Sequence, residues 1–163
     1  MAVIFWDASG LIKRYLTEAG SATVNAVFVS SQTFDHATTP SGYTETYAAL
    51  LRKRNGGVLN RTEFEVAVVA LQTEVVQSAD FGLLSISDQT IFASVEIIHR
   101  HNLNSTDAAI LTMLLDYARE MEASCLLIAA DQRLLRAAAA EGLATLNLES
   151  VSAADVPALL AAV

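Results

Sequence analysis

Two short apolar runs that each end at an aspartate constrain the fold of this chain more than any other feature of its sequence. Residues 2–6 are followed by Asp7, and residues 124–130 are followed by Asp131. Uninterrupted apolar runs of this length are typical of strands that are covered on both faces, as in parallel sheets. Ligands of open parallel sheets collect at the carboxyl ends of the strands. The sequence therefore predicts a buried sheet with two carboxylates at its ligand-binding edge.

Segments with helical and strand-like patterns alternate along the rest of the chain. Strands are expected at residues 2–6, 33–39, 83–87, 124–130 and 143–148, with helices at about 9–18, 21–30, 40–55, 62–79, 91–101, from 105 onward, from 132 to 141 and, at the end of the chain, after Asp155. The expected helix caps are Ser9, the pair Thr62 and Glu65, and Ser105 with Thr106. Such alternation implies right-handed crossovers and a three-layer α/β/α fold around a mostly parallel central sheet.

Length and composition predict one compact intracellular domain. The chain has 163 residues, of which 53% are hydrophobic and 17% charged, so it can fill a sizeable core. Cys125 is its only cysteine, which excludes an internal disulfide and fits a reducing compartment. We expect no signal peptide and no membrane span, and hence a cytoplasmic protein. Residues 1–149 are expected to form the main domain, followed by an Ala- and Leu-rich tail at 150–163.

Four carboxylates are expected to converge on one rim of the sheet. Asp7 and Asp131 end apolar strands, Asp107 stands in the first turn of a helix, and Glu45 lies about one turn into the helix after the second strand. Carboxylates this close together repel one another and tend to hold protons unless divalent cations neutralise them. Mg²⁺ and Mn²⁺ prefer oxygen ligands, and two such ions roughly 3.5–4 Å apart can stabilise both oxygens of a phosphodiester displacement.

Each acid also has a structural explanation when it is taken alone. Asp131 can cap the helix that follows it, Asp107 complements the dipole of its helix, and Asp7 can accept a hydrogen bond from the next turn. Glu45 has no basic residue three or four positions later, so no local ion pair explains it. The four acids together favour a metal site over four separate structural roles.

The net charge of −8 bears on the kind of substrate. A simple nucleic-acid binder normally carries a basic stripe, and this chain has only ten Lys and Arg residues. An acidic cluster that binds divalent cations nevertheless becomes a phosphate-binding site. The charge is therefore compatible with an enzyme that acts on a polyanion through bound metal ions.

The ordered set of acids resembles PIN domains, and most closely the VapC-type toxins. The resemblance rests on Asp7-Ala8-Ser9 after an apolar strand, on Glu45 in a helix, and on Thr106-Asp107-Ala108-Ala109 at the start of another helix. It continues through residues 130–135 and Glu141-Gly142-Leu143, and it covers the chain to about Glu149. The helix at 60–79 and the tail match least well.

This resemblance implies a Mg²⁺- or Mn²⁺-dependent endoribonuclease, a hydrolase that cleaves RNA. It assigns Asp7, Glu45, Asp107 and Asp131 as metal-binding catalytic acids, with the hydroxyls of Ser9 and Thr106 supporting them. It also implies a homodimer and a small cognate antitoxin that covers the acidic pocket. A catalytically silent PIN-like module that only binds a protein partner is the alternative from another functional class.

Basic residues near the acids are candidate phosphate contacts. Lys13 and Arg14 lie beyond Asp7, and Arg133 and Arg136 follow Asp131. Such contacts position a nucleic acid without reading its sequence. The run at 52–54 and the three histidines are explained as well by helix C-terminal charge and by structural or solvent-facing positions.

Other phosphoryl-transfer families fit the sequence less well. A haloacid-dehalogenase phosphatase needs a second aspartate two residues after the first, where this chain has Ser9. A response-regulator receiver needs an acidic pair at the first strand and a late lysine after a strand. The chain also lacks a glycine-rich phosphate loop.

Overall fold

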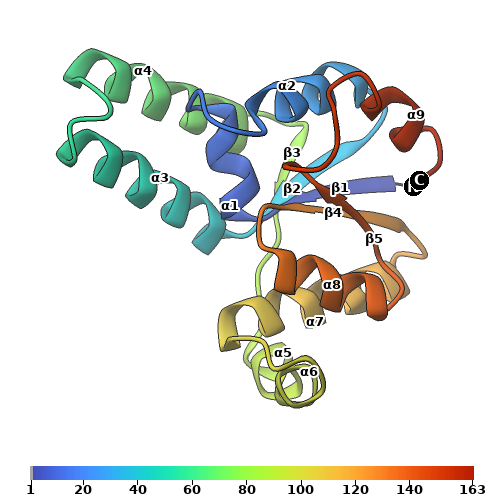
Figure 1. Ribbon diagram of the computed structural model, residues 1–163. Coiled ribbons are helices and arrows are strands. Elements are labelled where there is room, and N and C mark those ends of the chain that lie inside the picture. The colour runs from blue at the N-terminus through green and yellow to red at the C-terminus, as the bar shows by residue number, and fades with distance from the viewer. Residues whose placement is uncertain (1) are drawn as a thin grey trace.

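The computed structural model, which describes residues 2–163, contains a five-stranded sheet in the order β3-β2-β1-β4-β5. The strands are β1 (Ala2–Trp6), β2 (Asp35–Thr38), β3 (Phe81–Leu83), β4 (Ser124–Ala129) and β5 (Ala144–Asn147). Each strand is parallel to its neighbours (Figure 1). The expected α/β/α architecture is confirmed, with a sheet that is parallel throughout the described residues.

Helices cover both faces of this sheet. They are α1 (Ala8–Leu11), which continues into a 3₁₀ turn (Ile12–Arg14), α2 (Ser21–Ser30), α3 (Pro40–Asn55), α4 (Arg61–Leu71) with a π-helical turn (Gln72–Val76), α5 (Asp88–Ala93), α6 (Val95–His101), α7 (Ser105–Glu120), α8 (Gln132–Ala140) and α9 (Val156–Leu160). Helices α1–α4 and α9 lie on one side, and α5–α8 lie on the other (Figure 1).

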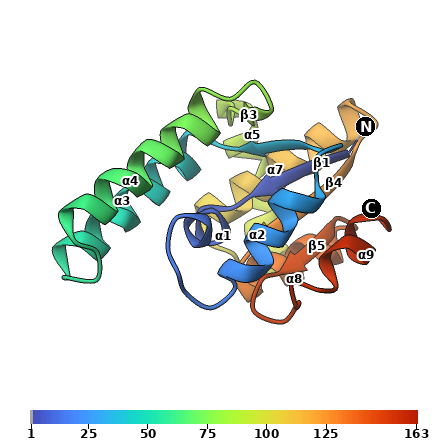
Figure 2. The ribbon, with the colours of Figure 1, turned by 90° about the horizontal axis from the view of Figure 1, so that it is seen from above.

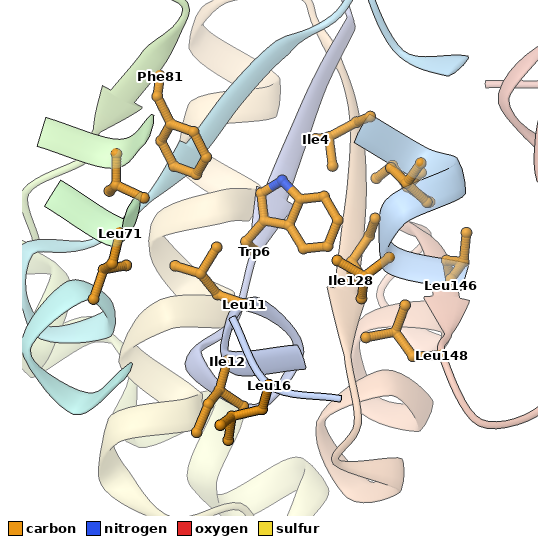
Figure 3. Close-up of a cluster of buried hydrophobic side chains, with 14 of the residues drawn as sticks. Ile4, Trp6, Leu11, Ile12, Leu16, Leu71, Phe81, Ile128, Leu146 and Leu148 are labelled. Carbon is orange, nitrogen blue, oxygen red and sulfur yellow. The ribbon is translucent and has the colours of Figure 1, made fainter. Parts of the chain in front are cut away.

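The alternation of side chains along β1 divides the core into two clusters. Ile4 and Trp6 pack with side chains of α1, α2, α3 and α4, whereas Val3 and Phe5 pack with side chains of α7 and α8. Figure 3 shows the Trp6 indole among side chains of the first cluster. All these strand residues are almost completely buried, which accounts for their continuous apolar sequence.

Trp6 connects β1 to β2 through an aromatic stack. Its ring centroid lies 4.8 Å from that of Phe28 and 6.0 Å from that of His36. Its Nε1–H donates to His36 Nδ1 at 2.8 Å, and His36 Nε2 lies 2.9 Å from Ser31 Oγ. Burial lowers the pKa of His36, which favours the neutral ring that this network requires.

Helices α3 and α4 form an antiparallel pair that extends away from the sheet (Figure 2). Tyr47 and Phe64 meet edge to face across the pair, with ring centroids 5.9 Å apart. Leu50 and Leu71 are fully buried and belong to the same core cluster as Ile4 and Trp6. Apolar packing therefore joins the pair to the body of the molecule.

The expected helix caps were wrong by one or two residues. Asp7, not Ser9, caps α1, and Asn104, not Ser105 or Thr106, caps α7. The capping box of α4 is formed by Asn60 and Glu63 in place of Thr62 and Glu65. In each case an Asp or Asn lies upstream of the expected cap, and its side chain accepts from the backbone of the first turn.

Two strands and one helix also differ from expectation. The second strand is shorter at both ends, and the third begins at Phe81, two residues early. The helix expected through 91–101 is interrupted at Ser94, which separates α5 from α6. Ile91 and Val95, which were expected on the buried stripe of this helix, are 49% and 60% exposed.

The tail packs against the body of the molecule. Val156 and Leu160 of α9 join the core cluster that contains Ile4, and α9 lies beside α2 (Figure 2). Thr23 Oγ1 donates to the Val151 carbonyl at 2.8 Å, which fixes the segment before α9. No helix among residues 2–163 has the length and hydropathy needed to span a membrane.

Candidate active site

The carboxyl ends of β1 and β4 are joined by hydrogen bonds. The Asp7 amide donates to the Ile128 carbonyl at 3.0 Å, and the Ala130 amide donates to Ser9 Oγ at 3.0 Å. The Asp7 carboxylate accepts from the Ser9 amide at 3.0 Å and also from the Ser9 hydroxyl. Ser9 thus links Asp7 to the segment that leads into Asp131.

The end of β2 brings α3 to the same edge. Thr38 Oγ1 donates to the Trp6 carbonyl at 2.7 Å, and Thr39 caps α3 by accepting from the Gly42 amide at 2.9 Å. A Cβ at Gly42 would lie only 2.5 Å from Thr38 Oγ1, so glycine permits this close approach. Glu45 follows less than a turn later along α3.

A shallow hollow of about 280 Å³ lies between α1 and α3. Ala8, Ser9 and Ile12 line it from the α1 side, while Glu45 and Arg52 contribute from α3. Glu45 therefore lines the same hollow as Ser9, which contacts Asp7.

Asp107 stands in the first turn of α7, next to the start of α8. Asn104 caps α7 through its Oδ1, which accepts from the Asp107 amide at 2.9 Å, and its Nδ2 donates to Asp107 Oδ2 at 2.7 Å. Arg133 Nη2 donates to the Asn102 carbonyl at 2.5 Å. This bond joins the first turn of α8, which Asp131 caps, to the loop that leads into α7.

The electrostatics place the four acids in one neighbourhood. The pKa of Asp107 is raised to about 6, chiefly by burial and then by the charges of Asp7, Asp131 and Glu45, while the hydrogen bond from Asn104 lowers it. Burial and the charge of Asp7 raise the pKa of Glu45. Like charges at a distance of many ångströms would have no such effect on one another.

Two of the acids also have the structural roles that the sequence allowed. Asp131 Oδ1 accepts from the amides of Arg133 at 2.7 Å and Leu134 at 3.2 Å. Asp7 caps α1 in the same way. Each carboxylate uses one of its two oxygens to accept from backbone amides. Helix capping is therefore compatible with ligand binding by the same carboxylate.

The donor set has the chemistry of a Mg²⁺ or Mn²⁺ site, although the side chains do not form a closed cage. All four groups offer carboxylate oxygens, which these hard cations prefer. Among residues 2–163, no three His, Cys, Asp or Glu side chains are close enough to hold one metal ion in common. Among the described residues the four acids are thus electrostatically coupled without forming a ready metal cage.

Two of the expected phosphate contacts are engaged elsewhere. Lys13 is buried, and its Nζ donates to Glu18 at 3.2 Å and to the Ala19 carbonyl at 2.8 Å. Arg14 pairs with both carboxylate oxygens of Glu74. These contacts argue against phosphate binding by Lys13 and Arg14, because their charged groups are already neutralised by carboxylates from within the chain.

The remaining candidate residues, Arg133 and Thr106, lie close to the acids in sequence and are exposed. Arg133 is exposed and uses one nitrogen for the Asn102 carbonyl. Thr106 is exposed beside Asp107. Sequence reasoning missed Asn104, although an Asn three positions before an acid at a helix start is a recognisable capping pattern.

Comparison with known proteins gives matches only at the level of the fold. The chain matches no family model, and no curated protein sequence is similar enough to count as a relative. Among solved structures, Mycobacterium tuberculosis VapC20, described as a sarcin–ricin loop cleaving toxin, superposes with a TM-score of 0.62 and 18% identity over 88% of this chain and 98% of its own. PAE2754 from Pyrobaculum aerophilum gives a TM-score of 0.58 and 17% identity over 99% and 97%. The fold is that of a PIN domain.

Proposed function

We propose that this chain is a Mg²⁺- or Mn²⁺-dependent endoribonuclease that hydrolyses phosphodiester bonds in RNA. The proposal is supported most by the hydrogen bonds through which Ser9 links Asp7 to the segment before Asp131, together with the raised pKa of Asp107, to which burial contributes most and the charges of the other three acids add. Four segments far apart in sequence supply one acid each to this edge. A protein without a cationic ligand gains nothing from collecting uncompensated carboxylates there.

In the proposed site, Asp7, Glu45, Asp107 and Asp131 hold the cations, and bound cations would supply charge stabilisation to the phosphate and lower the pKa of a water nucleophile. Ser9 orients Asp7 through two hydrogen bonds. Asn104 orients Asp107 through its side-chain amide. Hydrogen bonds of this kind hold metal-binding carboxylates in a fixed orientation.

A catalytically silent module that only binds a partner is the second candidate, and metal binding separates the two. The proposed enzyme should be stabilised by Mn²⁺ because the folded state binds the ion at a site that the unfolded chain lacks. At a Mn²⁺ concentration about 100 times Kd the gain is ~2.7 kcal/mol. For a chain of this length that corresponds to roughly 5–10 °C in Tm.

The measurement is a thermal melt followed by circular dichroism with and without Mn²⁺, for the wild type and for Asp7→Asn. Asparagine retains the oxygen that caps α1, so the variant should fold but show a much smaller shift. An equal Mn²⁺ shift in both proteins would remove Asp7 from the ligand set. No shift in the wild type would favour the silent module.

We further propose that the chain is the toxin of a toxin–antitoxin pair and that it acts as a homodimer. The fold shared with VapC20, a toxin, supports the toxin role, and an acidic site offers a natural target for a basic side chain of an inhibitor. Co-expression with the product of the neighbouring gene should yield a complex on size-exclusion chromatography with light scattering, and RNA cleavage by that complex should be suppressed. Elution of the chain without a partner would argue against the toxin role but not against nuclease activity.

A further inference from the structure

A second hollow, about 290 Å³ in volume, lies between the end of α6 and α8 and is lined almost entirely by basic groups. Arg100 and His101 come from the last turn of α6, and Arg133 and Arg136 come from α8. Three of the ten Lys and Arg residues of a chain with net charge −8 therefore meet in one small hollow. The distribution concentrates positive charge where the average surface is negative.

The charge of this hollow is only partly neutralised. Glu141 Oε1 lies 2.6 Å from Arg100 Nη1 and 2.6 Å from His101 Nε2, so one carboxylate serves two of the basic groups. Arg133 bonds a neutral carbonyl, and Arg136 takes part in no ion pair within the described chain. Among residues 2–163, the guanidinium charges of Arg133 and Arg136 thus have no carboxylate partner.

The hollow adjoins the proposed metal site. Arg133 lies two positions after Asp131, whose carboxylate accepts from the Arg133 amide at 2.7 Å. The Asn102 carbonyl that Arg133 binds belongs to the short loop that ends at Asn104, the residue bonded to Asp107. Arg133 and this loop therefore connect the basic hollow to Asp131 and Asp107 through hydrogen bonds.

We propose that the basic hollow formed by Arg100, His101, Arg133 and Arg136 binds a backbone phosphate of the RNA next to the one that is cleaved. This assignment rests on the proposed nuclease function. Arginine guanidinium groups present forked donors that match phosphate oxygens. The hollow explains how an acidic protein holds a polyanion, and it directs the RNA across α6 and α8, because Lys13 and Arg14 near α1 are already paired.

Arg100→Gln and Arg136→Gln test the assignment without touching the acids. Arg61→Gln and Arg119→Gln are matched controls, because these arginines are exposed, form local ion pairs on other helices, and change the net charge by the same amount. All four changes are placed in the Asp107→Asn background in EDTA, so that binding is measured without cleavage. Circular dichroism verifies the fold of each variant.

Binding of an end-labelled RNA hairpin is measured by fluorescence anisotropy over a range of salt concentrations. Each hollow variant should bind about tenfold more weakly than its background protein, the effect of losing one charged hydrogen bond. The slope of log K against log salt should become shallower by about 1 for each lost phosphate contact. The two controls should keep both the affinity and the slope of the background protein within about twofold, the small effect expected of exposed charges.

Hollow variants that bind like the controls, or a background protein that does not bind the hairpin at all, would overturn the assignment. Metal-dependent cleavage by proteins with an intact Asp107 is assayed separately. If the protein cleaves RNA but the hollow variants bind it as well as the background protein does, the nuclease function holds and only the role of the hollow in RNA binding is wrong. Absent cleavage contradicts the nuclease function, whatever the binding result.

Discussion

Replacing Asp107 by asparagine is expected to reduce metal-dependent RNA cleavage by about 100-fold or more while leaving the fold intact. Residues that merely support metal ligands are already worth ~10–100-fold in activity or metal affinity, and Asp107 is proposed as a ligand itself. Asparagine keeps the shape of the side chain but loses the negative charge that holds a divalent cation. The measurement is the initial rate of cleavage of a labelled RNA at saturating Mn²⁺.

Asp116→Asn is the matched control for this variant. Asp116 lies on the same helix, has a side chain that is 39% exposed, and within residues 2–163 pairs only with Arg119 three positions later. The same chemical change there should leave the cleavage rate within about twofold, because isolated surface ion pairs contribute little. Undiminished cleavage by Asp107→Asn would remove Asp107 from the metal site, and equal losses in both variants would point to a general effect of charge.

Trp6→Ala is expected to produce the largest loss of stability, about 3–5 kcal/mol. Trp6 is fully buried at the centre of the sheet, stacks on Phe28, and donates to His36. The substitution removes this packing and leaves a cavity between β1 and the helices above it. A loss of this size is a large part of the ~5–15 kcal/mol that stabilises a typical domain.

Urea unfolding followed by far-ultraviolet circular dichroism measures this loss, since Trp6 is the only tryptophan and its fluorescence disappears with it. Trp6→Phe serves as the comparison. It retains most of the ring but leaves His36 Nδ1 without its donor, which costs ~1–3 kcal/mol for a buried polar atom. An alanine variant that lost under 1 kcal/mol, or less than the phenylalanine variant, would contradict the role of Trp6 in the core.

The main strands and the acids at their ends were predictable because their signals are local. A run such as residues 2–6 can only be buried on both faces, and β1 has those bounds. Pro40 and the residues around Asn55 likewise predicted α3 with its observed bounds. The general geometry of parallel sheets predicts that Asp107 approaches Asp7, and the charge of Asp7 contributes to the raised pKa of Asp107, but a shared metal site remains a proposal.

Contacts between distant residues were not predictable from the same patterns. Arg14 pairs with Glu74, which is 60 positions away, and nothing in the sequence around Arg14 marks that partner. Lys13 is buried and donates to the Ala19 carbonyl, a contact that depends on the path of the loop between them. The basic hollow was missed for the same reason, since Arg100 and Arg136 lie on separate helices and meet only in the folded chain.

The position of β1 bears on when the proposed metal site can form. β1 comes first of the five strands along the chain, yet one of its two neighbours is β4, and Ser9 and Ala130 bond across 121 positions. Contacts between such distant residues close long loops and form slowly. A segment that stops before β4 lacks Asp131 and leaves one side of β1 unpaired. The proposed site therefore cannot assemble during synthesis before β4 and Asp131 have been added.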